Sequence, residues 1–355
     1  MLDLLAEAER LAGELNDQPR LARVLSYANR CFWWLGQHER GVAAGERALS
    51  IARVLTDVAL EGVANYHLGL SCMFAGDYRR GVEVYRRSSE ILTGGLELQR
   101  FGMPALPGVI SRAWLGYGLA CLGDFSGGVA MAEEALRVAE AARHPYSIAV
   151  AVQGVGFPYV VQGNLPGSLR WLERALDLVQ AGSFAVLRVL NQTFLGRTLS
   201  LAGRHREAVT MLEDVVAYGE AIQFAPIRAL SLAWLGDAHR RAGQVARAMA
   251  TIDQASQATR APGQRAGEIE VFLAVAALHM SSGSPDLDAA RSAAQQALAL
   301  ADGLGARPLV ARAYLALGHV SRQTGASEQA AENLALARAM FTVMGMSYWL
   351  EQDSA

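Results

Sequence analysis

Residues 230–252 read LSLAWLGDAHRRAGQVARAMATI, and this stretch decides the fold. Before Gly243, the apolar residues Leu232, Leu235 and Ala238 follow the spacing of one helix face, and the segment after it has the same periodicity. A glycine between two such segments is typical of a helix C-terminus that needs a left-handed residue. The stretch therefore predicts two helices joined by a tight turn.

The turn glycine recurs along the whole chain, and a small residue often lies seven residues before it and five or six residues after it. Small residues at a fixed phase predict that paired helices approach closely. A period near 40 residues is typical of stacked repeats, in which each unit contacts its neighbours. The turn glycines are Gly36, Gly76, Gly123, Gly163, Gly203, Gly243, Gly283 and Gly325. Helix N-caps are expected just after several of them, at Asp77, Asp124, Asn164 and Ser327.

This helix–turn–helix unit resembles the tetratricopeptide repeat, through its small positions, its turn glycine and turns such as Gly76-Asp77-Tyr78. The resemblance covers nearly the whole chain, although the units are longer than the consensus and the closing proline appears only sporadically. It implies an all-α fold, a right-handed α-solenoid superhelix of about eight repeats of roughly 40 residues.

The chain is expected to form one tetratricopeptide-like solenoid over residues 1–355. The turn glycines place residues 1–19 in a partial half-repeat whose first helix is missing, which predicts a fragment of a longer protein. Residues 94–107 are expected to form an insert loop, and residues 345–355 a C-terminal cap. The expected repeats are 20–56, 57–93, 108–144, 145–183, 184–224, 225–264, 265–305 and 306–344.

Two stretches carry a narrower resemblance. RFGMPALPGVISRAWL (residues 100–115) and MFTVMGMSYWLEQ (residues 340–352) are similar to the repeat region of bacterial class III adenylate/guanylate cyclase proteins. In that family a cyclase domain and an ATPase domain precede the repeats, and maltose-regulator-type signalling ATPases carry similar arrays. The resemblance implies a regulatory or partner-binding role, with possible ATPase or cyclase domains missing from the N-terminal side.

Composition narrows the classes of function. A net charge of −2 argues against nonspecific nucleic-acid binding, which depends on phosphate neutralisation. The sequence contains no lysine, which excludes a Walker A phosphate loop and a Schiff-base lysine. Three cysteines at different phases of the repeat favour a reduced, cytoplasmic protein without disulfides. No signal peptide or membrane span is expected.

No catalytic pattern stands out in the sequence. HExxH, CxxC and GxSxG are absent, and the histidines are scattered. Neighbouring carboxylates such as Glu133-Glu134 point to different sides of a helix. We therefore expect no enzyme, no cofactor and no metal site.

In the tetratricopeptide family, residues 13, 10, 6, 3 and 2 before the turn glycine face the concave groove, and the resemblance places this chain's groove in the same way. The first half of that groove is then aromatic and apolar, and the second half is charged. The strongest groove candidates are Arg23, Arg30, Trp33, Trp34, Tyr66, Leu70, Met73, Phe74, Tyr117, Gln153, Phe157, Arg197, Asp237 and Arg240. The same positions include Arg241, Glu270, Arg312, His319 and Arg322.

Aromatic anchors flanked by arginine are typical of binding hot spots, so a protein or peptide partner is expected in the groove. The alternative is that a tightly wound superhelix buries these side chains as core. Arg100 and Phe101 of the insert loop are further candidates, since a loop on a rigid scaffold often carries specificity.

Two functions remain open on this basis. The first is a non-enzymatic protein-interaction scaffold, the regulatory region of a larger bacterial signalling protein. The second is a sensor of a peptide or small molecule that controls an attached ATPase or nucleotide cyclase. A purely structural spacer is a third interpretation.

Overall fold

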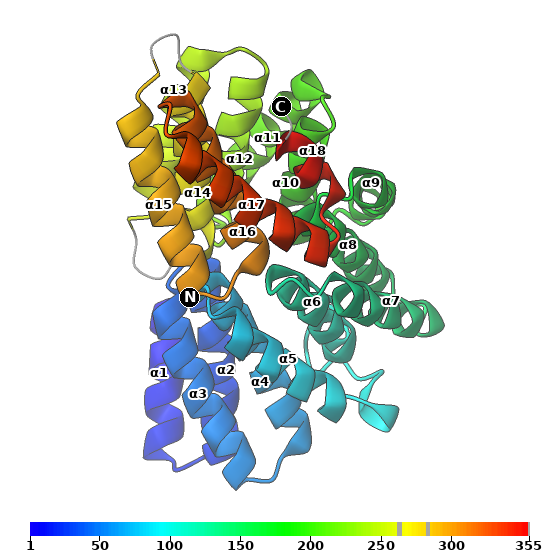
Figure 1. Cartoon of the computed structure of the whole chain (residues 1–355). Coiled ribbons are helices and arrows are strands. Elements are labelled where there is room, and N and C mark those ends of the chain that lie inside the picture. The colour runs from blue at the N-terminus through cyan, green and yellow to red at the C-terminus, as the bar shows by residue number, and fades with distance from the viewer. Residues whose placement is uncertain (261–264, 282–284, 354–355) are drawn as a thin grey trace.

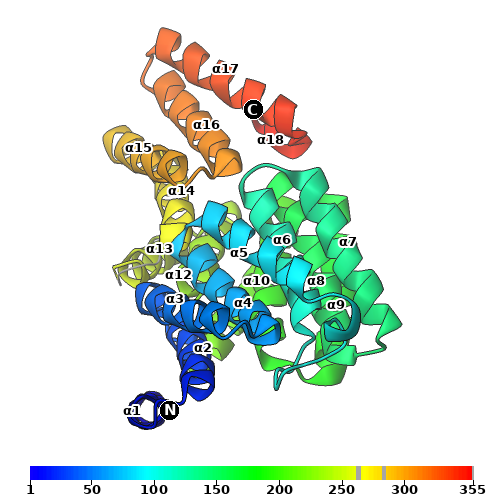
Figure 2. The same cartoon turned by 90° about the horizontal axis from the view of Figure 1, so that it is seen from below.

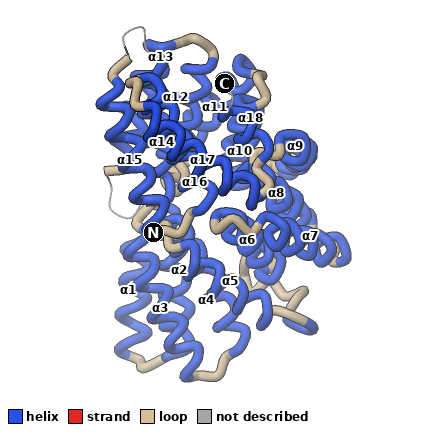
Figure 3. The backbone as a smooth tube through the Cα atoms, viewed as in Figure 1, coloured by secondary structure: helices blue, strands red, loops and turns tan. Residues whose placement is uncertain are grey.

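The computed structural model describes residues 1–260, 265–281 and 285–353, and these residues form helices without any strand (Figures 1 and 3). The helices are α1 (Leu2–Glu14), α2 (Gln18–Trp34), α3 (His38–Val54), α4 (Val58–Ala75), α5 (Tyr78–Ile91), the 3-10 turn η1 (Gly94–Leu96), α6 (Pro107–Cys121), α7 (Phe125–Ala141), α8 (Pro145–Gln162), α9 (Leu165–Gly182), α10 (Ala185–Leu201), α11 (His205–Ala221), α12 (Arg228–Arg241), α13 (Val245–Ala258), α14 (Arg265–Ser281), α15 (Leu287–Gly303), α16 (Arg307–Gln323), α17 (Ser327–Met344) and α18 (Ser347–Asp353).

The helices pack in consecutive pairs, from α2 with α3 to α16 with α17. Each pair also contacts the next one, and α1 and α18 lie at the two ends of the series. The first helix of a pair is buried on most sides, whereas the second keeps an exposed outer face, as the largely buried α10 and the half-exposed α11 illustrate. The predicted all-α, tetratricopeptide-like solenoid is confirmed.

The turn glycines have the left-handed backbone that the ladder predicts, with φ between 72° and 94° at Gly36, Gly76, Gly123, Gly163, Gly203, Gly243 and Gly325. Gly283 lies outside the described residues. The side chains of Asp77, Asp124 and Asn164 accept the backbone N–H three residues later, so these three predicted N-caps are confirmed. The prediction for Ser327 is wrong, because Ala326 is the N-cap of α17 and Ser327 is the first residue of the helix.

Small residues let the paired helices touch through their backbones. A Cβ atom on Gly116 would lie 2.5 Å from the carbonyl oxygen of Gly128, and a Cβ on Gly128 would lie 2.6 Å from that of Gly116. No side chain fits at this crossing without moving α6 away from α7. The small positions of the repeat therefore set the distance between its two helices.

The superhelix winds tightly enough for its later helices to reach the earlier ones. α14 contacts α4 and α16 contacts α6, and Figure 2 shows α16 beside α6 and far from α1. The Gln162 amide donates a hydrogen bond of 3.2 Å to the Gly345 carbonyl, across 183 residues of chain. Near the middle, Ala225 N–H donates to the Trp34 carbonyl at 3.1 Å. These contacts between successive turns narrow the inside of the superhelix.

Candidate functional site

The first half of the inner face is filled by its own side chains. Trp33, Tyr66, Leu70, Met73, Gln153 and Phe157 were predicted in the groove, and each is at most 3% exposed. The cavity that remains beside them, bordered by α2, α4, α6, α8 and α10, has a volume of only about 30 Å³. That space suits about one water molecule. In this structure these side chains contact one another and are not presented to solvent.

Edge-to-face and tilted aromatic contacts run through this half from repeat to repeat. The ring centroids of Trp33 and Phe74 are 5.7 Å apart, and those of Phe157 and Phe194 are 4.1 Å apart. Trp114 lies between Phe74 and Phe157, and the series continues from Phe194 to Trp234. The groove prediction missed Trp114, Phe194 and Trp234. Each of them lies nine residues before a turn glycine, a recurrence that the sequence shows.

Four other predicted residues of this half are only partly buried: Arg30, Trp34, Phe74 and Tyr117. The Arg30 guanidinium donates to the Tyr66 hydroxyl at 3.4 Å, and Trp34 packs against Phe224 with ring centroids 5.0 Å apart. Tyr117 lines a cavity of about 70 Å³ that extends from Phe74 towards the second half of the inner face. This cavity connects the aromatic half to the charged half.

The insert loop comes close to the first repeat. Phe101 and Arg23 line the same surface depression, about 120 Å³ in volume, together with residues of α2 and α4. Phe101 has a left-handed backbone with φ of 49°, and Arg100 is exposed. The structure thus brings Arg23 and Phe101 together, away from the other predicted groove residues.

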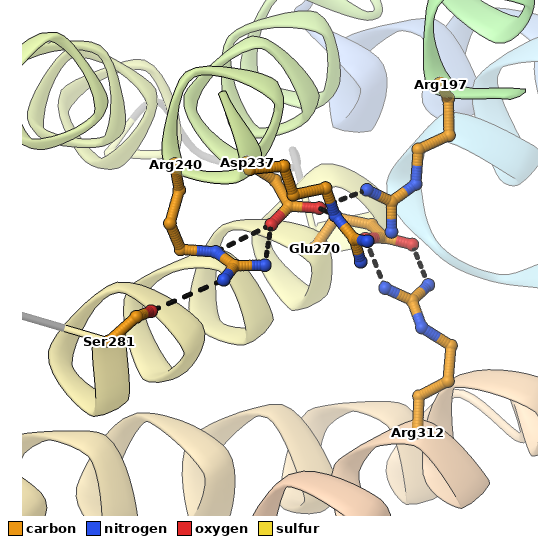
Figure 4. Close-up of polar contacts among 7 residues, drawn as sticks. Arg197, Asp237, Arg240, Glu270, Ser281 and Arg312 are labelled. Atoms are coloured by element: carbon orange, nitrogen blue, oxygen red, sulfur yellow. Dashed lines mark hydrogen bonds and ion pairs between the residues drawn. The ribbon is translucent and has the colours of Figure 1, made fainter. Parts of the chain in front are cut away.

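The second half of the inner face holds a larger cavity, about 370 Å³ in volume, bordered by α10, α12, α14, α16 and α18. Figure 4 shows side chains from α10, α12, α14 and α16 converging there. Four arginines and two carboxylates line it, and we call these six residues the arginine cluster: Arg197, Asp237, Arg240, Arg241, Glu270 and Arg312. Arg197, Asp237 and Arg240 were among the strongest predicted groove residues, and the structure brings them together.

Asp237 is the centre of the arginine cluster. Its Oδ2 accepts from Arg197 Nη1 at 2.7 Å and from Arg241 Nε at 2.9 Å, while its Oδ1 accepts from Arg240 Nη2 at 2.7 Å. Glu270 forms a second, two-bond pair with Arg312, in which Nη2 donates to Oε2 at 2.9 Å and Nη1 donates to Oε1. Paired bonds of this kind fix the planes of both groups.

The cluster is buried but charged. Burial alone would raise the pKa of Asp237, yet the guanidinium groups of Arg241, Arg240 and Arg197 hold it well below its ordinary value. Burial likewise opposes ionisation of Glu270, and Arg312 and Arg197 lower its pKa. Both carboxylates are therefore ionised near neutral pH, so the cluster carries four positive and two negative charges.

Two tryptophan rings contact guanidinium groups of the arginine cluster. The Arg197 guanidinium carbon lies 5.7 Å from the Trp234 ring centroid, and the Arg312 guanidinium carbon lies 4.5 Å from that of Trp349. Such cation–π contacts stabilise a guanidinium in a fixed position. Trp349 belongs to α18 and has no counterpart in the repeats, so repeat periodicity alone could not have found it.

The described residues include two Ser–His hydrogen bonds of the kind used in nucleophilic catalysis, and the serine of each is buried. Ser147 Oγ lies 2.9 Å from His144 Nδ1, and Ser147 is fully buried. Ser26 Oγ lies 2.7 Å from His67 Nδ1, but both side chains are at most 2% exposed, and burial lowers the pKa of His67 to about 3. Within the described ranges, no group of three or more metal-ligating side chains comes together, and none of the helices there could cross a membrane.

Known structures share this architecture. The chain is similar to the Rap conjugation gene regulator of the plasmid pLS20 in complex with the Phr* peptide, with 12% identity over 97% of this chain and 93% of that chain and a TM-score of 0.64. A Rap protein complexed with competence and sporulation factor covers 91% of this chain and 98% of its own, with 11% identity and a TM-score of 0.63.

A signal-transduction ATPase with numerous domains and a tetratricopeptide-repeat sensor, from Pyrococcus horikoshii, matches 99% of this chain and 53% of its own, at 11% identity and a TM-score of 0.51. No protein-family model and no curated protein matches the chain. At these identities the likenesses show the fold alone, which is the tetratricopeptide-type α-solenoid.

Proposed function

We propose that this chain is a non-enzymatic regulatory module that binds a peptide inside its superhelix, in the cavity beside the arginine cluster. The observation that carries the proposal is the contrast in volume, about 370 Å³ beside the cluster against about 30 Å³ in the aromatic half. A cavity of several hundred Å³ suits one or two residues of a ligand. Two of the similar folds, the Rap proteins, were solved with a bound peptide or factor, which supports binding of a peptide by this fold.

A peptide in this position would touch helices from several repeats. The cavity is bordered by α10 and α12 and also by α16 and α18, which lie several helices further along the chain. Binding would therefore favour one arrangement of these repeats over others, as a sensor requires. We further propose that the module works in the cytoplasm of a bacterium and controls a larger signalling protein, in agreement with the tetratricopeptide sensor of the similar ATPase.

The test is affinity selection of random hexapeptides on the immobilised chain, followed by isothermal titration of each selected peptide. Ala277 is half-buried at the cavity wall, so Ala277→Leu should fill part of the cavity and weaken binding at least about tenfold, a loss of about 1.4 kcal/mol. Ala250→Leu is the matched control, because Ala250 is exposed on α13 and does not line the cavity. Equal affinities of the two variants would contradict binding in this cavity.

A protein-interaction scaffold is the second candidate, and the insert loop favours it. Leu98 is 62% exposed beside the exposed Arg100, so this loop offers an apolar and a charged contact outside the superhelix. Replacing Leu98 and Arg100 by serine should abolish capture of a protein partner and leave peptide binding unchanged. Unchanged capture of the protein partner by this double variant would contradict a role of the insert loop in a protein-interaction scaffold.

A further inference from the structure

The charges of the arginine cluster do not balance. Among the described residues that line the cavity, the four guanidinium groups face only two carboxylates, Asp237 and Glu270. His319 lies at the same cavity and adds no negative charge. The cavity therefore carries a net charge of about +2 with neutral histidine, inside a chain whose total charge is −2.

The arginine cluster also has more hydrogen-bond donors than acceptor positions. A guanidinium offers five N–H donors and a carboxylate about four acceptor positions, so the cluster has roughly 20 donors for roughly eight acceptor positions. Asp237 already accepts from three arginines. A ligand that brings acceptors and negative charge would complete the cluster, whereas a ligand that brings a cation would add to the excess.

The four arginines that face the cavity differ in how much of their side chains is exposed. The side chain of Arg197 is 5% exposed and that of Arg312 is 12% exposed, while Arg240 and Arg241 keep 20% and 22%. Arg240 also reaches across to Ser281 Oγ of α14, with 3.3 Å between Nη1 and Oγ. Arg240 and Arg241 are thus the cations that a ligand in the cavity would meet first.

We infer that this cavity is a carboxylate-binding subsite, in which Arg240 and Arg241, supported by Arg312, bind an acidic group of the peptide. The inference rests on the proposed peptide binding and specifies its chemistry. The carboxylate could come from an aspartate or glutamate side chain or from the peptide C-terminus, and both would be bound by the same charge-assisted hydrogen bonds. The aromatic wall formed by Trp234 and Trp349 would lie against the neighbouring apolar part of the peptide.

The experiment uses the full chain and three pools of hexapeptides with acetylated N-termini. The first pool has one glutamate and an amidated C-terminus, the second has no acidic residue and a free C-terminal carboxylate, and the third has glutamine in place of glutamate and an amidated C-terminus. Peptides captured from each pool are titrated into the wild type, Arg240→Gln, Arg241→Gln and Arg247→Gln. Arg247 is the matched control, because it lies on α13 with 65% of its side chain exposed and does not line the cavity.

The expected result is capture from the first or second pool, with affinity reduced about tenfold to a hundredfold by Arg240→Gln or Arg241→Gln and less than twofold by Arg247→Gln. Capture from the first pool assigns the carboxylate to a side chain, and capture from the second assigns it to the C-terminus. Affinity should also fall as NaCl is raised, because the contacts are ionic. Melting temperatures and circular dichroism of each variant verify that the fold is retained.

Two results would overturn the inference. If only the third pool binds, or if acidic peptides bind equally to Arg240→Gln, Arg241→Gln and Arg247→Gln, the carboxylate subsite is wrong while peptide binding stands. If no pool binds saturably, the proposed function fails together with the subsite.

Discussion

The two halves of the inner face use equivalent repeat positions in opposite ways. Phe157 and Asp237 each lie six residues before their turn glycine. Phe157 is packed among Trp114, Tyr117 and Phe194, whereas Asp237 holds three arginines at the edge of an open cavity. One position of the repeat can thus supply either core or binding surface, and the side chains of the same and the adjacent repeats decide which. The aromatic half is expected to contribute mainly stability, and the charged half mainly recognition.

The largest effect should come from the aromatic half. Phe157→Ala removes a ring that is 3% exposed and touches three other rings, so it should lower the free energy of unfolding by about 3–5 kcal/mol. Chemical denaturation measures the loss. Phe32→Ala is the control, since this half-buried ring mainly covers the Arg40 guanidinium, and its loss should be clearly smaller. Similar losses would mean that the aromatic series has no special structural role.

In the charged half, removing one partner of an ion pair should lower the free energy of unfolding by less than Phe157→Ala does. It should lower it by more than removing both partners. Arg312→Met leaves the buried Glu270 without its two-bond partner and should destabilise the chain by about 3 kcal/mol. The double variant with Glu270→Met removes both charges and should recover most of that loss. A double variant that is as unstable as the single one would show that the pair is required for packing and not for charge compensation.

The two halves should also respond to acid in different pH ranges. Burial lowers the pKa of His38 to about 4 and that of His67 to about 3, below the ordinary histidine value of about 6.5. The unfolded chain then binds more protons, so each histidine should cost up to about 2 kcal/mol of stability at pH 5 relative to pH 7. Asp237 and Glu270, whose pKa values are lowered, lose their contribution only as the pH falls below about 4.

Urea denaturation at pH 7 and pH 5 measures this difference. Replacing His38 and His67 by glutamine should flatten the loss of stability between these two pH values, whatever the substitutions cost at pH 7. An unchanged dependence on pH in the double variant would show that other groups are responsible.

The smallest effect concerns the contacts between turns of the superhelix. Gly76 and Gly203 both have left-handed backbones, so alanine at either position should cost about 1 kcal/mol. A Cβ on Gly76 would also lie 2.7 Å from Leu304 Cδ1, whereas a Cβ on Gly203 would meet nothing within 4 Å. Gly76→Ala should therefore be the more destabilising substitution, and equal melting temperatures would argue against a close approach of α4 to the later turn.

Much of the fold could be predicted from the sequence because its signals are local. Helical periodicity and the turn glycines are features of a single repeat, so they predict the two-helix unit without reference to any long-range contact. The filling of the aromatic half could not be predicted in this way. Phe224 covers Trp33 and Trp34 only because small rotations accumulate over several repeats, and no single repeat encodes their sum.

The candidate site was predictable in part for the same reason. Arg197, Asp237 and Arg240 occupy family groove positions, so the resemblance could place them on one face. Trp349 joins them from α18, the short helix that follows the last repeat, so its position over Arg312 is not encoded in the repeat pattern. The predictions for Arg23, Arg30, Trp34 and the insert loop await binding experiments.

The hydrogen bonds from Gln162 to Gly345 and from Ala225 to Trp34 have a consequence for how the molecule unfolds. An open array behaves as a linear chain of units that melt one after another, since each is coupled only to its neighbours. Here distant units are also coupled, so a destabilising substitution in α8 should also lower the stability of α17 and α18. Deleting one internal unit would shift every later partner along the spiral, and the protein should tolerate such a deletion far less well than an extended array does.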